Sequence, residues 1–372
     1  LENFEPDVEG GYRRMNGFRK FVNHIVPQTS AASERVIGVA NFANKVVAAR
    51  GERIYNAAST ELATAITSSE TMSGSGIIKV DSVTGFTSSG TVQIESEIFT
   101  YTGISSTVSP NELTGVTRAT SSTSAAAHLG NVVVSTSWTQ IDTGRTNANK
   151  YRFERFNYNG TDKIIFVDEV NAPVVFDSSF NAVDVSNAAV AGSKFIASFK
   201  DHMFYAGKST TPEEIVFSEG FNEDGFSAGV ALPSGSIRVD DTITGLKVFR
   251  DALFVFCENR IFKLTGNTSS DFNMIPVTRS IGCLNGDTIQ EFAGDLVFLG
   301  PDGLRTVAAT AKIGDTELGT ISKNVQSIFD ANIRDSALFE SVVIADKTQY
   351  RIFFTKDGQA EGITRGVTCV MK

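Results

Sequence analysis

The chain has 372 residues, a formal net charge of -9 and a hydrophobic content of 41%. It contains no run of lysine or arginine, so it lacks the basic footprint of a protein that grips nucleic acid or an anionic membrane surface. No apolar run approaches the ~20 residues that a membrane-spanning helix needs, so we expect no membrane insertion by this chain. The 28 Phe and 32 Gly against 8 Pro are typical of many short strands joined by tight turns.

The first segment, residues 1–33, is predicted to be an N-terminal arm. Gly10 and Gly11 indicate a tight turn, and Arg13 and Arg14 beside it are either a solvated pair or a subunit contact. The next segment, residues 34–72, is predicted to be a first blade region, with alternating apolar residues typical of strands.

Residues 73–135 have a composition of their own and are predicted to be an inserted β-module. Four short strands are expected within it, at Gly76–Val80, Gly90–Ile94, Glu97–Gly103 and Asn131–Val134. The tract 119–127 is rich in Ser, Thr and Ala, whose side chains are too small and polar to build a core, so it is expected to be a surface loop.

An aromatic phrase recurs along the chain: an apolar residue, a short polar turn, and then a strand of aromatic and β-branched residues. Its copies that begin at Phe156, Phe199, Phe249 and Phe292 lie 43, 50 and 43 residues apart, whereas Phe42 lies 114 residues before Phe156. Removing the 63 residues of 73–135 leaves 51 and restores the period. A hairpin repeated at this spacing predicts an all-β protein, a β-propeller of about six blade-like units, with residues 136–372 forming the remaining blades. The alternative is an irregular β-sandwich.

One stretch departs from the strand pattern. Ile321, Val325, Ile328 and Phe329 fall on one face at helical spacing, and Ser322 is a suitable N-cap. A helix of about two turns is therefore predicted here, against a blade edge.

Side chains that could support chemistry are few and scattered. His24, His128 and His202 have no metal-ligand partner at i+2 to i+4, and His202 falls in a hairpin turn where an exposed imidazole is expected. The three cysteines are expected to be free thiols inside the protein, as in a reducing compartment: Cys257, Cys283 and Cys369. The sequence thus predicts no catalytic residue, no metal site and no cofactor site, and we expect no enzyme activity.

Acidic pairs are the remaining candidates. Propellers that hydrolyse sugars bring carboxylates from several blades to the axial mouth, so these pairs leave a glycan-cleaving or carbohydrate-binding propeller open as an alternative. Solvated turn residues are the simpler interpretation. The pairs are Asp168-Glu169, Glu213-Glu214, Glu223-Asp224 and Asp240-Asp241, of which the last follows a predicted strand directly.

The predicted insert resembles a small module that recurs in virion proteins of tailed phages. That module has the pattern G-x-i-x-i-x-x-E-x-i-x-Y-t-G, then f-t-g-v-x-R-G, then a-a-x-H. The matching stretches run from Gly85 to Gly103, from Leu113 to Arg118 and from Ala125 to His128. Ala119 stands where the pattern has a glycine, so the turn at that point could differ.

The sequence around the insert is similar to tail nozzle and tail-stabilisation (tail tubular) proteins of short-tailed bacteriophages. Gly10 to Phe18 is similar to their opening, G-G-l-r-x-R-x-G-f. Further short phrases follow in the order of that family: Val239 to Leu246, Arg260 to Gly266, Ser280 to Cys283 and Leu299 to Leu304.

The resemblance implies a structural virion protein, a tail nozzle or tail-tube subunit that forms a homo-oligomeric ring, a hexamer, around the DNA exit channel. Implied partners are a tail adaptor or portal-side ring and possible tail fibres, with double-stranded DNA passing the lumen without specific binding. The implied location is the virion tail, after assembly in the host cytoplasm. A baseplate or tail-hub protein of a long-tailed phage is the other alternative. We also expect that the chain is part of something longer.

Overall fold

The computed structural model describes residues 4–6, 12–14, 35–148, 150–308, 336–356 and 364–370. The helix predicted at 321–329 and most of the 1–33 arm lie outside these ranges. The described chain is built from strands, with two short 3-10 turns at Gly286–Thr288 and Ala345–Lys347. This confirms the predicted all-β class.

The chain divides into two compact units, which we describe separately. The insert-bearing unit is Phe18–Asp184, and the blade unit is Leu1–Gly17 with Val185–Lys372.

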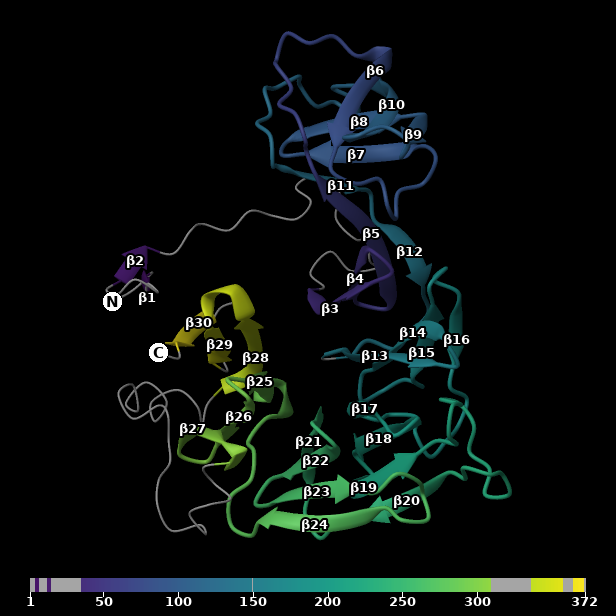
Figure 1. Ribbon diagram of the computed structural model, residues 1–372, viewed down its shortest axis with the longest axis vertical. Coiled ribbons are helices and arrows are strands. Elements are labelled where there is room, and N and C mark those ends of the chain that lie inside the picture. Colours follow the sequence, from purple (N-terminus) through teal and green to yellow (C-terminus); the bar gives the residue numbers. More distant parts are fainter. Residues whose placement is uncertain are drawn as a thin grey trace. The chain divides into compact units, whose positions relative to one another are not determined.

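The insert-bearing unit contains a ten-stranded antiparallel sheet in the order β3-β4-β5-β11-β7-β8-β10-β6, with β12 paired to β5 and β9 to β10 (Figure 1). Its strands are β3 (Val36–Phe42), β4 (Lys45–Arg50), β5 (Arg53–Glu61), β6 (Ser73–Val80), β7 (Gly90–Ile94), β8 (Glu97–Tyr101), β9 (Gly103–Ser105), β10 (Asn111–Thr117), β11 (Val133–Thr136) and β12 (Thr139–Asp142). A separate four-stranded sheet follows, made of β13 (Arg152–Tyr158), β14 (Thr161–Val167), β15 (Val174–Asp177) and β16 (Ala182–Asp184).

Strand β5 belongs to two packing environments. Its first six residues pair with β4, and part of this stretch also pairs with β12, where Asn56 lies opposite Thr139. Its last three residues pair instead with β11, where Glu61 lies opposite Val133. The nine residues of β5 therefore carry the chain from the four-stranded meander β3-β4-β5-β12 directly into the inserted module.

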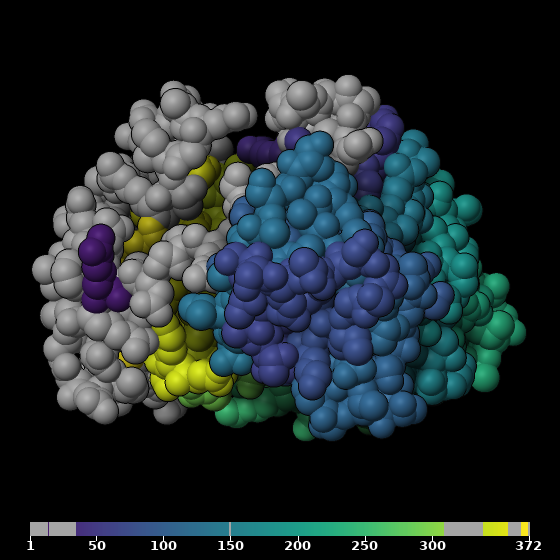
Figure 2. Space-filling view, turned by 90° about the horizontal axis from the view of Figure 1, so that it is seen from above, coloured from purple at the N-terminus to yellow at the C-terminus, as the bar shows by residue number. Residues whose placement is uncertain are grey.

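The module has its own apolar core, in which Val92, Phe99, Tyr101 and Leu113 are almost fully buried. Leu62, Ile66 and Met72, which precede the predicted boundary at residue 73, belong to the same core. Two β-bridges hold the first two there, Leu62 to Val80 and Ile66 to His128, and the Met72 carbonyl accepts the Arg118 amide at 3.1 Å. The module residues, coloured blue, gather into one body in the space-filling view (Figure 2).

The blade unit contains four successive antiparallel sheets of three or four strands (Figure 1). They are β17 (Phe195–Phe199), β18 (His202–Lys208), β19 (Thr211–Phe217) and β20 (Gly235–Arg238); β21 (Ile243–Phe249), β22 (Ala252–Cys257), β23 (Ile261–Thr265) and β24 (Asn273–Thr278); β25 (Gln290–Phe292), β26 (Asp295–Gly300) and β27 (Gly303–Thr306); and β28 (Ser336–Ile344), β29 (Gln349–Lys356) and β30 (Thr364–Val370). A two-stranded pair, β1 (Phe4–Pro6) and β2 (Tyr12–Arg14), belongs to the same unit.

Each of these four sheets buries its faces against the next one along the chain. Leu253 of β22 shares a core with Phe204 of β18, and Phe298 of β26 shares one with Phe256 of β22. Tyr350 of β29 in turn packs with Leu299 of β26. Such packing of successive sheets on one another is the arrangement of propeller blades.

The recurring aromatic phrase marks the first hairpin of successive sheets. Lys200 and Asp201, at the tip of the β17–β18 hairpin, both have positive φ (47° and 64°), and Ala293 and Gly294 do so between β25 and β26 (56° and 77°). Two residues with positive φ form the type I′ turn whose twist matches paired strands. The second residue of each of these two turns, Asp201 or Gly294, is of a type that tolerates this backbone, whereas Lys200 and Ala293 are not.

The cysteines are free, as predicted. Cys257 and Cys283 are buried, and Cys369 is half-buried. Burial raises the pKa of the Cys283 thiol to about 12 and also raises those of Cys257 and Cys369. The protonated thiols behave here as small apolar side chains.

Candidate functional site

The most concentrated group of charges in the inserted module is a buried cluster of Glu97, Arg118 and His128 (the buried ionic cluster). Glu97 opens β8, Arg118 follows β10, and His128 lies at the end of the loop after it. Their exposed fractions are 0%, 8% and 1%. Buried charges are stable only when they are paired and hydrogen-bonded.

Arg118 uses all five of its N–H groups. Its Nε and Nη2 donate to the two carboxylate oxygens of Glu97, both at 2.8 Å, in the bidentate geometry that suits a guanidinium. Nη1 donates to the carbonyls of Thr67 and Glu70 at 2.8 Å, and Nη2 also donates to the Ala126 carbonyl at 2.7 Å. The arginine thus ties β8 to the segment before β6 and to the loop before His128.

Glu97 accepts five hydrogen bonds. Besides the two from Arg118, they come from the Ala119 amide at 3.1 Å, the Ala126 amide at 2.9 Å and Nε2 of His128 at 2.9 Å. Burial by itself would raise the pKa of Glu97, but the bonds from Arg118, the Ala126 amide and His128 outweigh it and lower that pKa. The bond to Glu97 likewise raises the pKa of Arg118.

His128 lies between two carboxylates. Its Nε2 faces Glu97, and its Nδ1 is 3.0 Å from Oε2 of Glu95. Both ring nitrogens therefore have a carboxylate oxygen within hydrogen-bond distance, and the role of each nitrogen depends on the tautomer. Phe99 packs edge-on against the imidazole, with ring centroids 5.9 Å apart.

This cluster is saturated. The donors of Arg118 and both ring nitrogens of His128 already have partners, and Glu97 accepts from five groups, so no group is left to bind a substrate or to act as a nucleophile. Its effect is to hold the 119–128 loop, as covalent bridges would in a secreted domain. The sequence-based expectation that His128 lacks partners concerned only neighbours at i+2 to i+4, and its true partners lie 31 and 33 residues away.

The cluster consists of the charged positions of the phage-module pattern: the E, the R and the H are Glu97, Arg118 and His128. The other restrictive positions are also accounted for by packing. The Y is Tyr101, 2% exposed in the module core. Gly115 has a φ of +62°, and a Cβ added there would lie 1.9 Å from Oγ1 of Thr102, so a larger residue cannot fit without a shift. The pattern therefore encodes a fold rather than a reactive centre.

Ala119, which stands where the pattern has glycine, keeps the turn that glycine favours. Its φ is +55°, in the left-handed region. A residue with a Cβ costs about 1–2 kcal/mol in this conformation, whereas glycine is unstrained there. The alanine is held in place by the hydrogen bond from its amide to Glu97.

We expect Ala119→Gly to stabilise the module by up to about 1 kcal/mol, because relief of the left-handed strain exceeds the extra chain entropy of glycine. Ala126, which also donates its amide to Glu97 and whose φ is not positive, is the matched control. Ala126→Gly should lose about 0.5–1 kcal/mol. Urea denaturation of the three proteins measures both changes, and a loss of stability in Ala119→Gly would contradict the strain argument.

The structure corrects the expectation for His202. The hairpin turn consists of Lys200 and Asp201 alone, and His202 is the first residue of β18. Because its side chain points into the blade, it is fully buried, with Nδ1 2.6 Å from the carbonyl of Ser218. Its ring packs against Phe217 and Phe272, each with centroids 5.5 Å away.

The acidic pairs are engaged locally. Asp240 pairs with Arg260, and Asp241 accepts hydrogen bonds from the amides of Thr242 and Asn259 at 2.9 and 2.7 Å. The two hydrogen bonds that Asp241 accepts stabilise the turn after β20, so its role there is structural.

Two of the other pairs also have local partners for their carboxylates. Arg238 lies 3.4 Å from Glu213 and 3.5 Å from Glu214, so one guanidinium serves both. The Asp168 carboxylate is buried and accepts the amides of the two residues at 170 and 171, while Glu169 pairs with Arg152 at 3.1 Å. In the fourth pair Glu223 is buried, and it is its backbone carbonyl rather than its carboxylate that accepts the Tyr205 hydroxyl at 2.6 Å.

Within the described ranges, no group of three or more His, Cys, Asp or Glu side chains could hold a metal ion. In the same part of the chain, no helix has both the length and the apolar character needed to cross a bilayer.

Comparison with protein-family models gives no match, and comparison with curated proteins gives none either. Among solved structures, the chain is similar to the extracellular domain of BT4673 from B. thetaiotaomicron, with 11% identity and a TM-score of 0.37. It is also similar to PorZ, a bacterial surface component of the type-IX secretion system of Porphyromonas gingivalis, with 11% identity and a TM-score of 0.38. The matches cover 88% and 91% of this chain but only 38% and 33% of those proteins.

Hsv2p of Kluyveromyces lactis is similar over 91% of this chain and 97% of its own, with 9% identity and a TM-score of 0.32. At such identities the likeness concerns the fold alone. The sheet topology and the packing of successive sheets are those of a β-propeller protein: the described residues form five separate sheets of three or four strands and a larger antiparallel sheet in addition.

Proposed function

We propose that this chain is a structural virion protein, a subunit of the tail nozzle or tail tube of a tailed phage. The observation that carries the proposal is the buried ionic cluster. The resemblance to the phage virion module rests on a few widely spaced letters, and the three charged ones form a single bonded group. A chance match of isolated letters would have no reason to converge in this way.

The proposed architecture has six blades. The meander β3-β4-β5-β12 has the strand number and pairing of a blade, and it packs through Phe42 and Val47 against Phe166 and Phe176 of the next sheet. The module at 73–135 would then be an elaboration of the first blade, with 34–72 before it and 136–372 completing the propeller.

The charge of the chain supports a role as a conduit. A wall that bound phosphates would slow a passing genome, because each neutralised phosphate adds to the affinity. With a net charge of -9, the protein should let double-stranded DNA pass without specific binding. The saturated cluster and the locally paired carboxylates fit a protein without enzyme activity.

The proposed assembly is a cyclic homo-oligomer, a hexamer by the resemblance, that meets a tail adaptor or portal-side ring and carries tail fibres where present. Closed rings of identical subunits are a common form of homo-oligomer. Residues 1–33 would contact a neighbouring subunit. The free Cys257 and Cys283 fit folding in the reducing host cytoplasm before incorporation into the tail.

Sedimentation velocity and negative-stain imaging of the full chain test this proposal. We expect a concentration-dependent shift from monomer to a closed six-fold ring, and no retention of linear double-stranded DNA even at about 50 mM salt. Deleting residues 1–20 should weaken the ring and spare the blades. A monomer at every concentration up to about 100 μM, or tight DNA binding that falls with salt, would contradict the proposal.

A further inference from the structure

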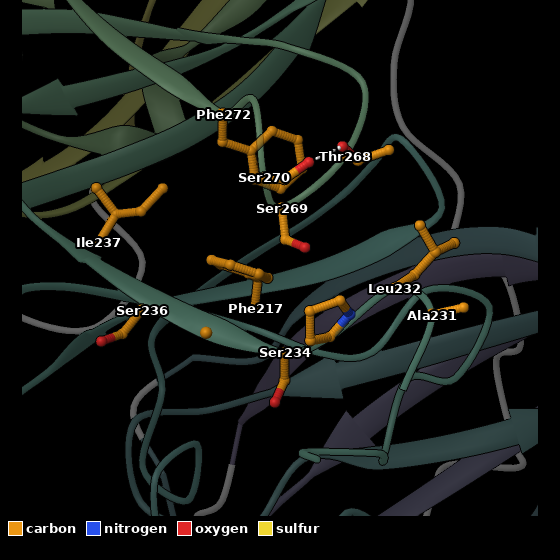
Figure 3. Close-up of a pocket in the computed structure, with 12 residues that line it drawn as sticks. Phe217, Ala231, Leu232, Ser234, Ser236, Ile237, Thr268, Ser269, Ser270 and Phe272 are labelled. Carbon is orange, nitrogen blue, oxygen red and sulfur yellow. Dashed lines mark hydrogen bonds between the residues drawn. The ribbon is translucent and has the colours of Figure 1, made fainter. Parts of the chain in front are cut away.

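A pocket of about 480 Å³ lies between two neighbouring blades of the blade unit (Figure 3). One wall comes from β19, β20 and the segment before β20, which belong to the sheet β17–β20. The other comes from the turn between β23 and β24 of the next sheet. The volume falls within the range of small-molecule sites in proteins, about 300–1,000 Å³.

The floor of the pocket is aromatic and rigid. Phe217 and Phe272 line it from the two blades, with ring centroids 5.5 Å apart and planes at 86°. Phe272 also packs against Phe204 and against His202 from behind, at 5.6 and 5.5 Å. Phe217 is 5% exposed and Phe272 is half-buried, so Phe272 supplies most of the aromatic surface that is open to a ligand. These rings are held in place before any ligand arrives, which reduces the entropy cost of binding.

The rim is made of hydroxyl groups, several of which Figure 3 shows around the phenyl rings. Thr268 and Ser270 hydrogen-bond each other at 2.9 Å, and Ser234 donates to the carbonyl of Ser227 at 3.2 Å. Ser236 and Ser269 make no side-chain hydrogen bond to another described residue, so their hydroxyls can each donate and accept.

The lining carries no charge. All twelve lining residues are neutral, and Asp271, next to the rim, uses Oδ1 to accept the amides of Asn267 and Thr268 at 2.9 and 2.7 Å. An ionic ligand would lose its hydration here without gaining an ion pair, so the pocket favours a neutral one.

We propose that this pocket binds one neutral pyranose ring, either of a simple pyranoside or at the end of a glycan chain. A pyranose has an apolar face of C–H groups, which fits the phenyl floor, and a ring of hydroxyls, each a donor and an acceptor, which match the serine and threonine rim. The site is independent of the assembly role proposed above. It gives the protein a saccharide-binding surface in addition to its proposed subunit contacts.

Saturation-transfer NMR on the full chain tests the site. The probes are the methyl pyranosides of glucose, galactose and mannose, a neutral trisaccharide of each, and cyclohexanol. We expect transfer to the C–H protons of at least one pyranoside at millimolar affinity, as suits a ligand of so few atoms. Tighter binding of the trisaccharide identifies a glycan chain as the ligand, and equal binding identifies a free sugar.

Two charge substitutions make the matched comparison. Ser269→Glu places a carboxylate within the pocket and should weaken pyranoside binding at least about tenfold, since the ligand must then compete with a solvated charge. Ser209→Glu adds the same charge in the exposed β18–β19 turn and should leave binding unchanged. Both sites are in loops, so both variants should fold.

Three outcomes would overturn the proposal. The first is no transfer to any pyranoside, and the second is binding that survives Ser269→Glu. The third is binding of cyclohexanol as tight as that of the best pyranoside, which would show an apolar pocket that makes no use of its hydroxyl rim.

Discussion

Replacing Arg118 with methionine is expected to destabilise the inserted module by about 3–5 kcal/mol. The substitution removes the guanidinium that neutralises the buried Glu97 carboxylate, and the loss of one partner of a buried pair costs far more than the pair contributes. It also removes the hydrogen bonds that the guanidinium donates, in the wild-type protein, to the carbonyls of Thr67, Glu70 and Ala126. The free energy of unfolding of a module of this size is of the same order as this loss, so we expect the module to unfold while the blades stay folded.

Arg155→Met is the matched control, because Arg155 pairs with Asp162 on the surface, where their side chains are 60% and 40% exposed. A surface pair contributes at most about 1 kcal/mol, so this variant should unfold near the wild-type urea midpoint. Hydrogen exchange resolved by residue should show lost protection in β6 to β10 for Arg118→Met only. Equal effects of the two variants would refute a structural role for the cluster.

The second large effect is the dependence of folding on the boundaries chosen for a deletion of the module. Replacing residues 60–135 with Asn-Gly, which joins Ser59 to Thr136, is expected to leave the blades folded and cooperative. The two ends are already adjacent, because the Ala58 amide donates to Oγ1 of Thr136 at 2.9 Å and Ser59 lies opposite Ser135. β5 keeps its pairing with β12 after the cut.

The shorter deletion of 73–135 should fail by comparison. It retains Leu62, Ile66 and Met72 but removes the core that covers them, and each loses about 1.5–3 kcal/mol of burial. We expect this variant to bind a hydrophobic dye and to aggregate, while the longer deletion does neither. Far-UV circular dichroism, dye fluorescence and urea denaturation compare them, and two equally soluble, cooperative proteins would show that these three side chains are not part of the module core.

The sequence by itself determined the features that depend on neighbours along the chain. The blade hairpins could be predicted because a two-residue turn with positive φ restricts its residues, and the strands around it restrict theirs. The insert could be recognised because its composition differs and its removal restores the repeat. Free thiols followed from the wide separation of the three cysteines. The start of the module core at Leu62 was not visible, because the bridge from Leu62 to Val80 joins residues on either side of a loop.

Only the tertiary structure decided what the charged and polar side chains do. Glu97 and Arg118 are 21 residues apart, and His128 is 31 residues from Glu97. His202 follows a turn, which suggested exposure, yet it faces inward because side chains alternate along a strand. The pocket joins residues of two blades. A buried charge is stable or costly according to the partners that folding brings within about 3 Å, and the linear sequence does not contain those distances.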